Sequence, residues 1–323
     1  MLRPPPPRSS LLLVVTALLG AGCGPWITQI PTYWDPPPYT PRVRPPEPPP
    51  VAVAAKPVPS PVPDDDEVAA PVDDRPACTA IYVVGVSRRL LAFDPRERSF
   101  SERGRLECPG PGWATPFSMA VAQDGKAHVL FQDHRIYSVD VVDATCTASP
   151  FVPDQAGFGL FGMGYAREGD GEALFVAHIP PFGNSKGLAR VDMETGELVP
   201  IGPFSDNPGR EIELTSTRDG LWGYFLNHSG LGGTLVEIQP GSAEVTTAIP
   251  LPTGNRASAL AVAWWGGDFY IFTSAGSLST EVTRYSPDKQ TVEVVAKLDD
   301  TIVGAGVSTC APDRKRKPTA VAP

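Results

Sequence analysis

The sequence lacks the short motifs that most often reveal a catalytic or nucleotide-binding site. It contains no Walker loop, no HExxH pair and no CxxC pair. A GxGxxG match at residues 157–162 stands in front of a strand-like segment, whereas a dinucleotide fingerprint follows a strand and opens a helix. The GxSxC run at 306–310 lacks the last glycine and the following helix of a nucleophile elbow. Motifs therefore assign no reaction to this chain.

Basic charge, helical periodicity and long apolar runs are also scarce. The net charge of −9 argues against a nucleic-acid partner, because such a partner requires a basic face. Residues 78–312 show no long stretch with the i, i+3, i+4 spacing of an amphipathic helix. The apolar run at residues 11–21 is shorter than the about 20 residues that cross a bilayer as a helix. These absences favour an all-β domain that does not bind nucleic acid.

Proline is abundant but unevenly spread. Of the 39 prolines, 21 fall in the first 77 residues. Because X-Pro pairs favour extended backbone and remove amide donors, residues 23–77 are expected to be a disordered Pro-rich tether. The remaining segments are a signal peptide at 1–22, a folded domain at 78–312 and a basic tail at 313–323.

The N-terminus predicts export. Arg3 and Arg8 precede the short apolar run, as in a secretory signal peptide. The run ends in Leu-Gly-Ala-Gly-Cys, which resembles the lipobox of bacterial lipoproteins, with Gly20 at the position where Leu is usual. This resemblance implies that Cys23 becomes acylated and anchors the chain to a membrane of the bacterial cell envelope. In lipoproteins of this kind an Asp after the cysteine retains the protein at the inner membrane, so the resemblance, with Gly24 in that position, implies the outer membrane.

A hairpin unit recurs along the folded domain. Its clearest copy is GLARVDMETGELVPIG at residues 187–202, with an Asp before the turn. Five copies have their marker residue at Asp94, Asp140, Asp192, Gln239 and Ser286, spaced by 46, 52, 47 and 47 residues. That spacing suits one four-stranded blade, so the sequence predicts a five-bladed β-propeller, with a six-bladed ring as the alternative.

The ends of the domain predict how the ring closes. The first unit begins with its apolar strand near residues 80–85, and a spare inner-type strand follows the last unit at 302–309. We expect this C-terminal strand to complete the first blade as a velcro closure. Cys78 and Cys310 flank these two strands, so they should form one disulfide, and Cys108 and Cys146 the other.

The blade pattern resembles the broad propeller group of NHL, SMP-30-like and quinoprotein-type repeats over residues 78–312. This resemblance implies the fold, and fold alone does not assign an activity. In propellers the loops that enter inner strands and the loops that leave second strands reach the same face, around the central tunnel. That face is therefore where a site is expected.

Carboxylates in these loops are the main chemical candidates. Asp154, Glu213 and Asp299 come from three blades and would suit Ca²⁺ or another divalent metal if their side chains converged. The four histidines are spread over three blades and are expected to be structural or solvated. No catalytic residue is assigned, and no cofactor or metal is expected as the first hypothesis.

Two functions remain open. The first is a lipid-anchored, non-catalytic propeller that presents a binding face to an envelope protein or a small ligand. The alternative is a divalent-metal-dependent hydrolase, lactonase-like or glycosidase-like, with its site at the propeller axis. Convergence of the three carboxylates near one point would favour the hydrolase, and an apolar axis would favour the binding module.

Overall fold

The computed structural model describes residues 73–206, 209–276 and 279–313. The chain divides into two compact units, Met1–Pro63 and Asp64–Pro323, and every described residue belongs to the second. The signal peptide, Cys23, the tether up to residue 72 and the basic run at 314–317 lie outside the described residues.

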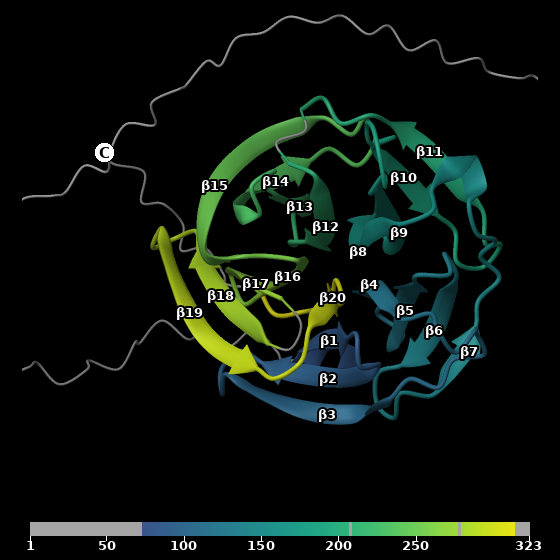
Figure 1. Cartoon of the computed structure of the whole chain (residues 1–323), viewed down its shortest axis with the longest axis horizontal. Coiled ribbons are helices and arrows are strands. Elements are labelled where there is room, and N and C mark those ends of the chain that lie inside the picture. The colour runs from purple at the N-terminus through teal and green to yellow at the C-terminus, as the bar shows by residue number, and fades with distance from the viewer. Residues whose placement is uncertain (1–72, 207–208, 277–278, 314–323) are drawn as a thin grey trace, which may run out of the picture. The chain divides into compact units, whose positions relative to one another are not determined.

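The described part of the chain folds into five four-stranded antiparallel sheets arranged as the blades of a propeller (Figure 1). The inner strands β4, β8, β12, β16 and β20 surround the axis, and β3, β7, β11, β15 and β19 form the rim. The five-bladed ring predicted from the repeat spacing is confirmed.

The blades follow one another around the axis. The first contains β20 (Ile302–Gly306), β1 (Ile81–Gly85), β2 (Arg89–Asp94) and β3 (Ser99–Arg105), in that order. The second contains β4 (Pro116–Val121), β5 (Lys126–Phe131), β6 (Ile136–Asp140) and β7 (Cys146–Ala148). The third contains β8 (Phe161–Glu168), β9 (Gly171–His178), β10 (Leu188–Val191) and β11 (Leu198–Gly202).

The fourth and fifth blades complete the ring. The fourth contains β12 (Glu211–Ser216), β13 (Leu221–Leu226), β14 (Leu231–Ile238) and β15 (Val245–Arg256). The fifth contains β16 (Ala259–Trp265), β17 (Asp268–Ser274), β18 (Thr280–Ser286) and β19 (Thr291–Leu298). The described helices are two short turns, α1 (Pro76–Thr79) and the 3₁₀ turn η1 (Gln155–Gly157).

The hydrophobic core is divided among the five blade junctions. One buried cluster lies between the first and second blades, and the other four occupy the remaining junctions in the same way. The second strand of each blade is apolar on both faces because a neighbouring blade covers each face. In β17 all seven residues are buried, for example. The sequence pattern of short, continuously apolar strands thus reflects sheets stacked on both sides.

The Asp turns form as predicted. The Asp192 side chain accepts hydrogen bonds from the amides of Glu194 (2.8 Å) and Thr195 (3.1 Å), and Gly196 supplies the positive φ of 76° that ends the turn. These amide contacts hold the pKa of Asp192 below its usual value. Asp94 and Asp140 accept the equivalent amide hydrogen bonds at 2.8 Å.

Ring closure uses the C-terminal strand. β20 pairs antiparallel with β1, with Tyr82 opposite Gly306 and Val84 opposite Gly304. The first blade is therefore built from both ends of the domain, as the missing inner strand of the first repeat predicted. A disulfide joins Cys78 to Cys310 across this closure, and a second joins Cys108 to Cys146 between the first and second blades.

Glycines let neighbouring inner strands approach one another at the axis. A Cβ on Gly162 of β8 would overlap the carbonyl oxygen of Ile212 in β12. A Cβ on Gly304 of β20 would lie 2.7 Å from the amide nitrogen of Met119 in β4. Because both contacts are with backbone, neither position has room for a side chain. The small residues of the inner strands are therefore a packing requirement of the five-bladed ring.

Candidate functional site: the axial mouth

One cavity opens at the axis, on the face where the chain enters the inner strands. It has a volume of about 240 Å³, and all five blades contribute to its wall. Its lining combines starts of inner strands with residues that follow second strands: Val86, Pro116, Phe117, Gln132, Ile179, Glu211, Ile212, Glu213, Ser258, Ala259, Leu260, Thr301 and Val303. We call this cavity the axial mouth. It lies on the face that the loop argument indicated.

The axial mouth is a blind pocket. Further along the axis the inner strands meet at Ala120, Met163, Leu214 and Ala305, where no space remains for a water molecule. This closure follows from the close backbone packing that the glycines allow. A ligand can therefore enter from one face only, and the axis is not a channel.

Glu213 is the most deeply buried carboxylate of the axial mouth. It is the third residue of β12 and its side chain is 4% exposed. Ser118 of β4 donates a hydrogen bond to its Oε2 at 2.7 Å, and the Met163 amide of β8 donates to the Ser118 hydroxyl at 3.1 Å. Burial raises the pKa of Glu213 well above its usual range, although the Ser118 hydrogen bond opposes this. Glu213 thus links three neighbouring blades through hydrogen bonds.

Glu211 is the carboxylate closer to solvent. It begins β12, and its side chain is 33% exposed. Burial raises the pKa of this carboxyl, and neighbouring Arg210 opposes the rise. Arg210 Nε lies 3.8 Å from Glu211 Oε1, which is longer than a hydrogen bond. Glu211 therefore places a carboxylate at the entrance to a largely apolar cavity.

Asp300 anchors the closing strand next to the axial mouth. Its carboxylate accepts hydrogen bonds from the Ser87 hydroxyl, from the Arg89 guanidinium at 3.2 Å and from the Thr301 amide at 2.8 Å. The Thr280 hydroxyl of the fifth blade donates to the Asp300 carbonyl at 2.7 Å. Asp300 is therefore a structural link between the first and fifth blades, whereas its neighbour Asp299 is exposed.

The three proposed metal ligands are not brought together. Asp154 precedes η1, and its Oδ1 lies 2.7 Å from His134 Nδ1. Glu213 accepts a hydrogen bond from Ser118, and Asp299 is exposed to solvent. Among the described residues, the one group of three His, Cys, Asp or Glu ligand atoms within 4.8 Å is Asp73, Cys78 and Cys310. The axial carboxylates therefore do not form the converging set that the hydrolase hypothesis needs.

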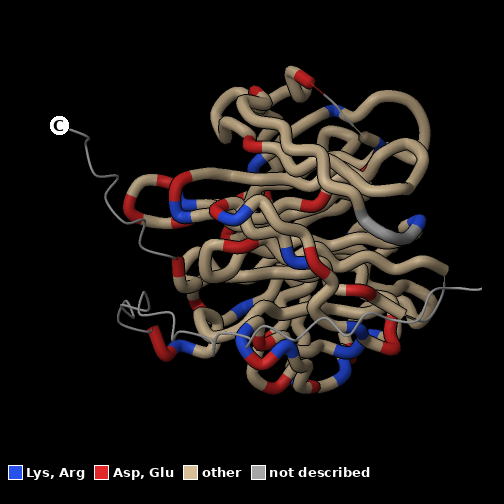
Figure 2. The backbone as a smooth tube through the Cα atoms, turned by 90° about the vertical axis from the view of Figure 1, so that its left-hand side faces the viewer, with Lys and Arg blue, Asp and Glu red and all other residues tan. Residues whose placement is uncertain are grey.

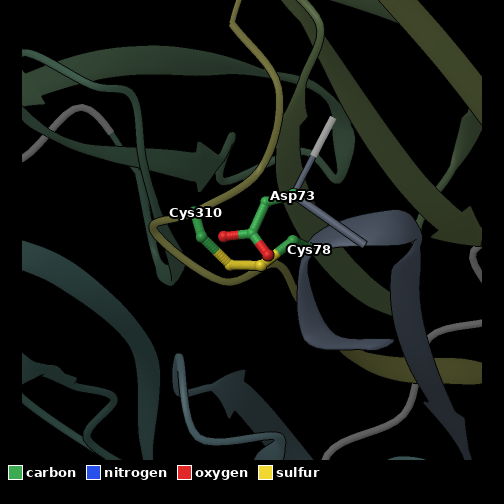
Figure 3. Close-up of side chains that lie close together, drawn as sticks. All are labelled: Asp73, Cys78 and Cys310. Atoms are coloured by element: carbon green, nitrogen blue, oxygen red, sulfur yellow. A yellow bond between two sulfur atoms is a disulfide. The ribbon is translucent and has the colours of Figure 1, made fainter. Parts of the chain in front are cut away.

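The Asp73 group is not suited to a metal either. Both of its sulfurs are joined in the Cys78–Cys310 disulfide, and Asp73 lies beside that bond (Figure 3). Arg75 donates hydrogen bonds to both oxygens of Asp73, from Nε at 2.9 and 3.0 Å and from Nη2 at 2.6 Å. A disulfide sulfur is not the thiolate that metals bind, so this group is structural.

The histidines do not share a site. His128 is buried in β5, and its Nδ1 lies 2.8 Å from the Tyr165 hydroxyl. Burial lowers the pKa of His128 to about 4. His178 accepts the Lys186 amide at 3.0 Å, and burial lowers its pKa too. His228 is exposed in the turn before β14. Their separate contacts fit the structural and solvated roles expected from the sequence.

Both described ends of the domain lie on the face opposite the axial mouth. Arg75 donates to the carbonyl of Gln123, in the turn between β4 and β5, and the Gly266 amide, between β16 and β17, donates to Pro312. Those turns follow the far ends of β4 and β16, whose first residues line the axial mouth. At about 3.3 Å per residue, six residues of strand separate the two faces by about 20 Å.

The edge-on view of the ring in Figure 2 shows acidic and basic residues interspersed along the backbone. Within the described residues, no helix is long and apolar enough to cross a membrane.

Comparisons with known proteins assign no family to this chain. No family model and no curated protein matches the sequence. A solved chain of a nidogen/laminin complex aligns at 7% identity and a TM-score of 0.46, covering 70% of this chain and 97% of that one. TolB from Acinetobacter baumannii aligns at 12% identity and a TM-score of 0.39, covering 69% of this chain and 54% of that one. These values carry no information about ligand or activity.

Several lining residues could not be chosen from the sequence. Ile179, Ser258 and Val303 are ordinary residues of a β protein, and only the ring brings them together. Gln132 directly follows β5, in a position that the loop argument covers, but no chemical signal distinguishes it from other loop residues. Glu213 was named from the sequence, and Glu211 reaches the same cavity because alternate residues of a strand share one face.

Proposed function

We propose that this chain is a lipid-anchored β-propeller of a bacterial cell envelope, most consistent with the outer membrane, and that it acts as a non-catalytic binding module. The axial mouth is its binding site. The observation that carries the proposal is a blind, largely apolar cavity to which all five blades contribute. Pockets of this kind, apolar with a few polar groups, are the usual form of a binding site. The partner is an envelope protein or a small ligand.

The proposed cellular location rests on the N-terminal sequence and on the cysteines. Residues 1–23 have the charged, apolar and cysteine-terminated pattern of a lipoprotein signal, so Cys23 would carry the acyl chains. Both disulfides of the ring suit an oxidising compartment outside the cytoplasm. A stable anchor needs more than one acyl chain, which the diacylated cysteine of a lipoprotein would supply.

The placement of the chain ends supports the same function. A tether that joins the ring at Asp73 attaches on the face opposite the axial mouth. The junction with the tether therefore does not cover the mouth.

Site-specific photocrosslinking tests the binding face. A photoreactive phenylalanine analogue replaces Phe182, which is 93% exposed in the loop after β9 on the mouth face. The control replaces Val142, which is 58% exposed in the turn between β6 and β7 on the opposite face. We expect discrete crosslinked products in intact cells from position 182 and none from 142. Products from neither position, or from 142 alone, would contradict the proposed site.

Metabolic labelling tests the anchor. Cells grown with an alkyne-tagged palmitate should label the full chain and retain it in the membrane fraction. The Cys23→Ser variant should lose the label and leave that fraction. An unlabelled wild-type chain would contradict lipid anchoring and leave the binding-face experiment unaffected.

A further inference from the structure

The charge of the axial mouth points to its ligand. Among the lining residues the ionisable side chains are Glu211 and Glu213, and no Lys, Arg or His belongs to the wall. Building on the proposed function, we infer that the axial mouth accepts a lysine or arginine side chain of a protein partner, with Glu211 as its charge partner. An alkyl stem would pack on the apolar wall while the cationic head reached the carboxylate.

The size of the cavity favours a single side chain over a drug-sized ligand. Pockets for drug-sized molecules occupy about 300–1,000 Å³. The axial mouth, at about 240 Å³, is below that range and closed at its inner end. It therefore suits one long side chain that enters from the mouth face. The apolar walls at Phe117, Ile179 and Leu260 match the aliphatic stem of such a side chain.

Glu211 and Glu213 would have different roles. Glu213 is tied to Ser118 and almost fully buried, so it forms part of the floor of the cavity. Glu211 is one-third exposed, and its ion-pair partner Arg210, at 3.8 Å, is beyond hydrogen-bond distance. A partly desolvated carboxylate gains most from a hydrogen-bonded cation, because charge-assisted hydrogen bonds are about twice as strong as neutral ones. Glu211 is therefore the recognition group.

Exposed apolar side chains around the mouth favour a protein as the source of the cation. Trp113 is 67% exposed in the loop before β4, and Phe182 lies three residues after Ile179 of the wall. Leu231 is 56% exposed and pairs with Arg256, two residues before Ser258 of the wall. A protein partner seated over the mouth face would remove these apolar groups from water, which is favourable. A free amine would leave these three side chains uncovered.

Selection from a random peptide library displayed on phage tests the inference. The target is the full chain purified after export, with its disulfides formed. We expect enriched peptides to contain a Lys or Arg flanked by apolar residues. Peptides that lack a basic residue, or no enrichment at all, would overturn the inference. Neither result would affect the crosslinking experiment at position 182, so failure of the inference can be distinguished from failure of the proposed function.

Variants then locate the charge contact. Glu211→Gln should weaken binding of the selected peptides about tenfold or more, since one charge-assisted contact is lost. The matched control is Glu194→Gln, which makes the same change at an exposed turn between β10 and β11 on the opposite face. Unchanged affinity in Glu211→Gln, or an equal loss in both variants, would overturn the assignment of Glu211.

Competition by the small cation butylguanidinium distinguishes a protein side chain from a free cation as the ligand. Butylguanidinium should compete with the peptides only at much higher concentration, because it cannot contact the rim. Phe182→Ala should weaken the peptides several-fold and leave butylguanidinium unaffected. If butylguanidinium bound as tightly as the peptides, a free cation rather than a protein side chain would be the ligand, and the inference would be wrong.

Discussion

Removing the closure disulfide should cost more stability than removing the other one. The Cys78–Cys310 bond spans 232 residues and the Cys108–Cys146 bond spans 38. In the chain-entropy model the closed loops are worth about 5.5 and about 3.9 kcal/mol of unfolding free energy, respectively. The Cys78→Ser/Cys310→Ser variant should therefore be less stable than Cys108→Ser/Cys146→Ser by roughly 1.6 kcal/mol.

The assay is equilibrium urea unfolding of both double variants and the wild type. Tryptophan fluorescence and far-ultraviolet circular dichroism should give coincident transitions, which justifies comparing free energies. Replacing both cysteines of a pair avoids leaving a free thiol that could mispair. The closure variant should have the lowest midpoint of the three.

Two outcomes would refute the reasoning. Equal losses in the two double variants would show that loop length does not govern the stabilisation. A larger loss from the shorter loop would place the main effect in the native contacts around Cys108 and Cys146. Wild-type protein reduced before unfolding should be less stable than either variant, since it lacks both links.

Three further predictions concern buried groups. Because burial raises the pKa of Glu213 above its usual 4.5, the folded state keeps a proton that the unfolded chain loses, so stability falls as pH rises above about 4.5. Glu213→Gln should remove this fall. The unfolding free energy of the variant relative to wild type should then increase with pH, by up to about 1.4 kcal/mol per pH unit. A series of thermal melts that shows no such pH-dependent difference would contradict the prediction. Gly162→Ala should lower the unfolding free energy by several kcal/mol, because its Cβ would overlap the backbone of β12. Gly241→Ala is the control: it has open space around it and should change stability by less than about 1 kcal/mol. Similar urea midpoints for the two variants would refute the packing argument. Asp300→Asn should lower the unfolding free energy by about 2 kcal/mol, because its hydrogen bonds would lose a charged acceptor. The control Asp299→Asn, at an exposed position, should change it by no more than about 0.5 kcal/mol. Equal urea midpoints for the two variants would contradict the structural role of Asp300.

The fold was predictable because its determinants are local and repeated. An apolar strand covered on both faces appears in every blade and an Asp turn in three of them, and both can be recognised within a dozen residues. The turns then recur at a regular spacing. The closure was predictable because the first repeat lacks an inner strand and the chain ends with one. The cysteine pairs followed from that closure, since it places Cys78 next to Cys310.

The candidate site was less predictable because its geometry depends on register. Asp299 and Asp300 are neighbours, yet one is exposed and the other is 5% exposed and bound to Arg89. A shift of one residue along β20 would reverse these roles. Likewise Glu213 points to the axis as the third residue of β12, which no loop composition reveals. Sequence reasoning indicated the face on which the cavity opens and named Glu213 of its wall, and it could not tell which charged residues are structural.

The closing strand also relates the axial mouth to the chain ends. β20 begins beside Thr301, which lines the mouth, and is followed by Cys310 on the opposite face. Asp300 holds its first end through Arg89 and Ser87, and the disulfide holds its last end. Both ends of β20 are therefore fixed to the first blade, one through Asp300 and the other through the disulfide. These two links hold the part of the mouth's wall that Thr301 and Val303 form.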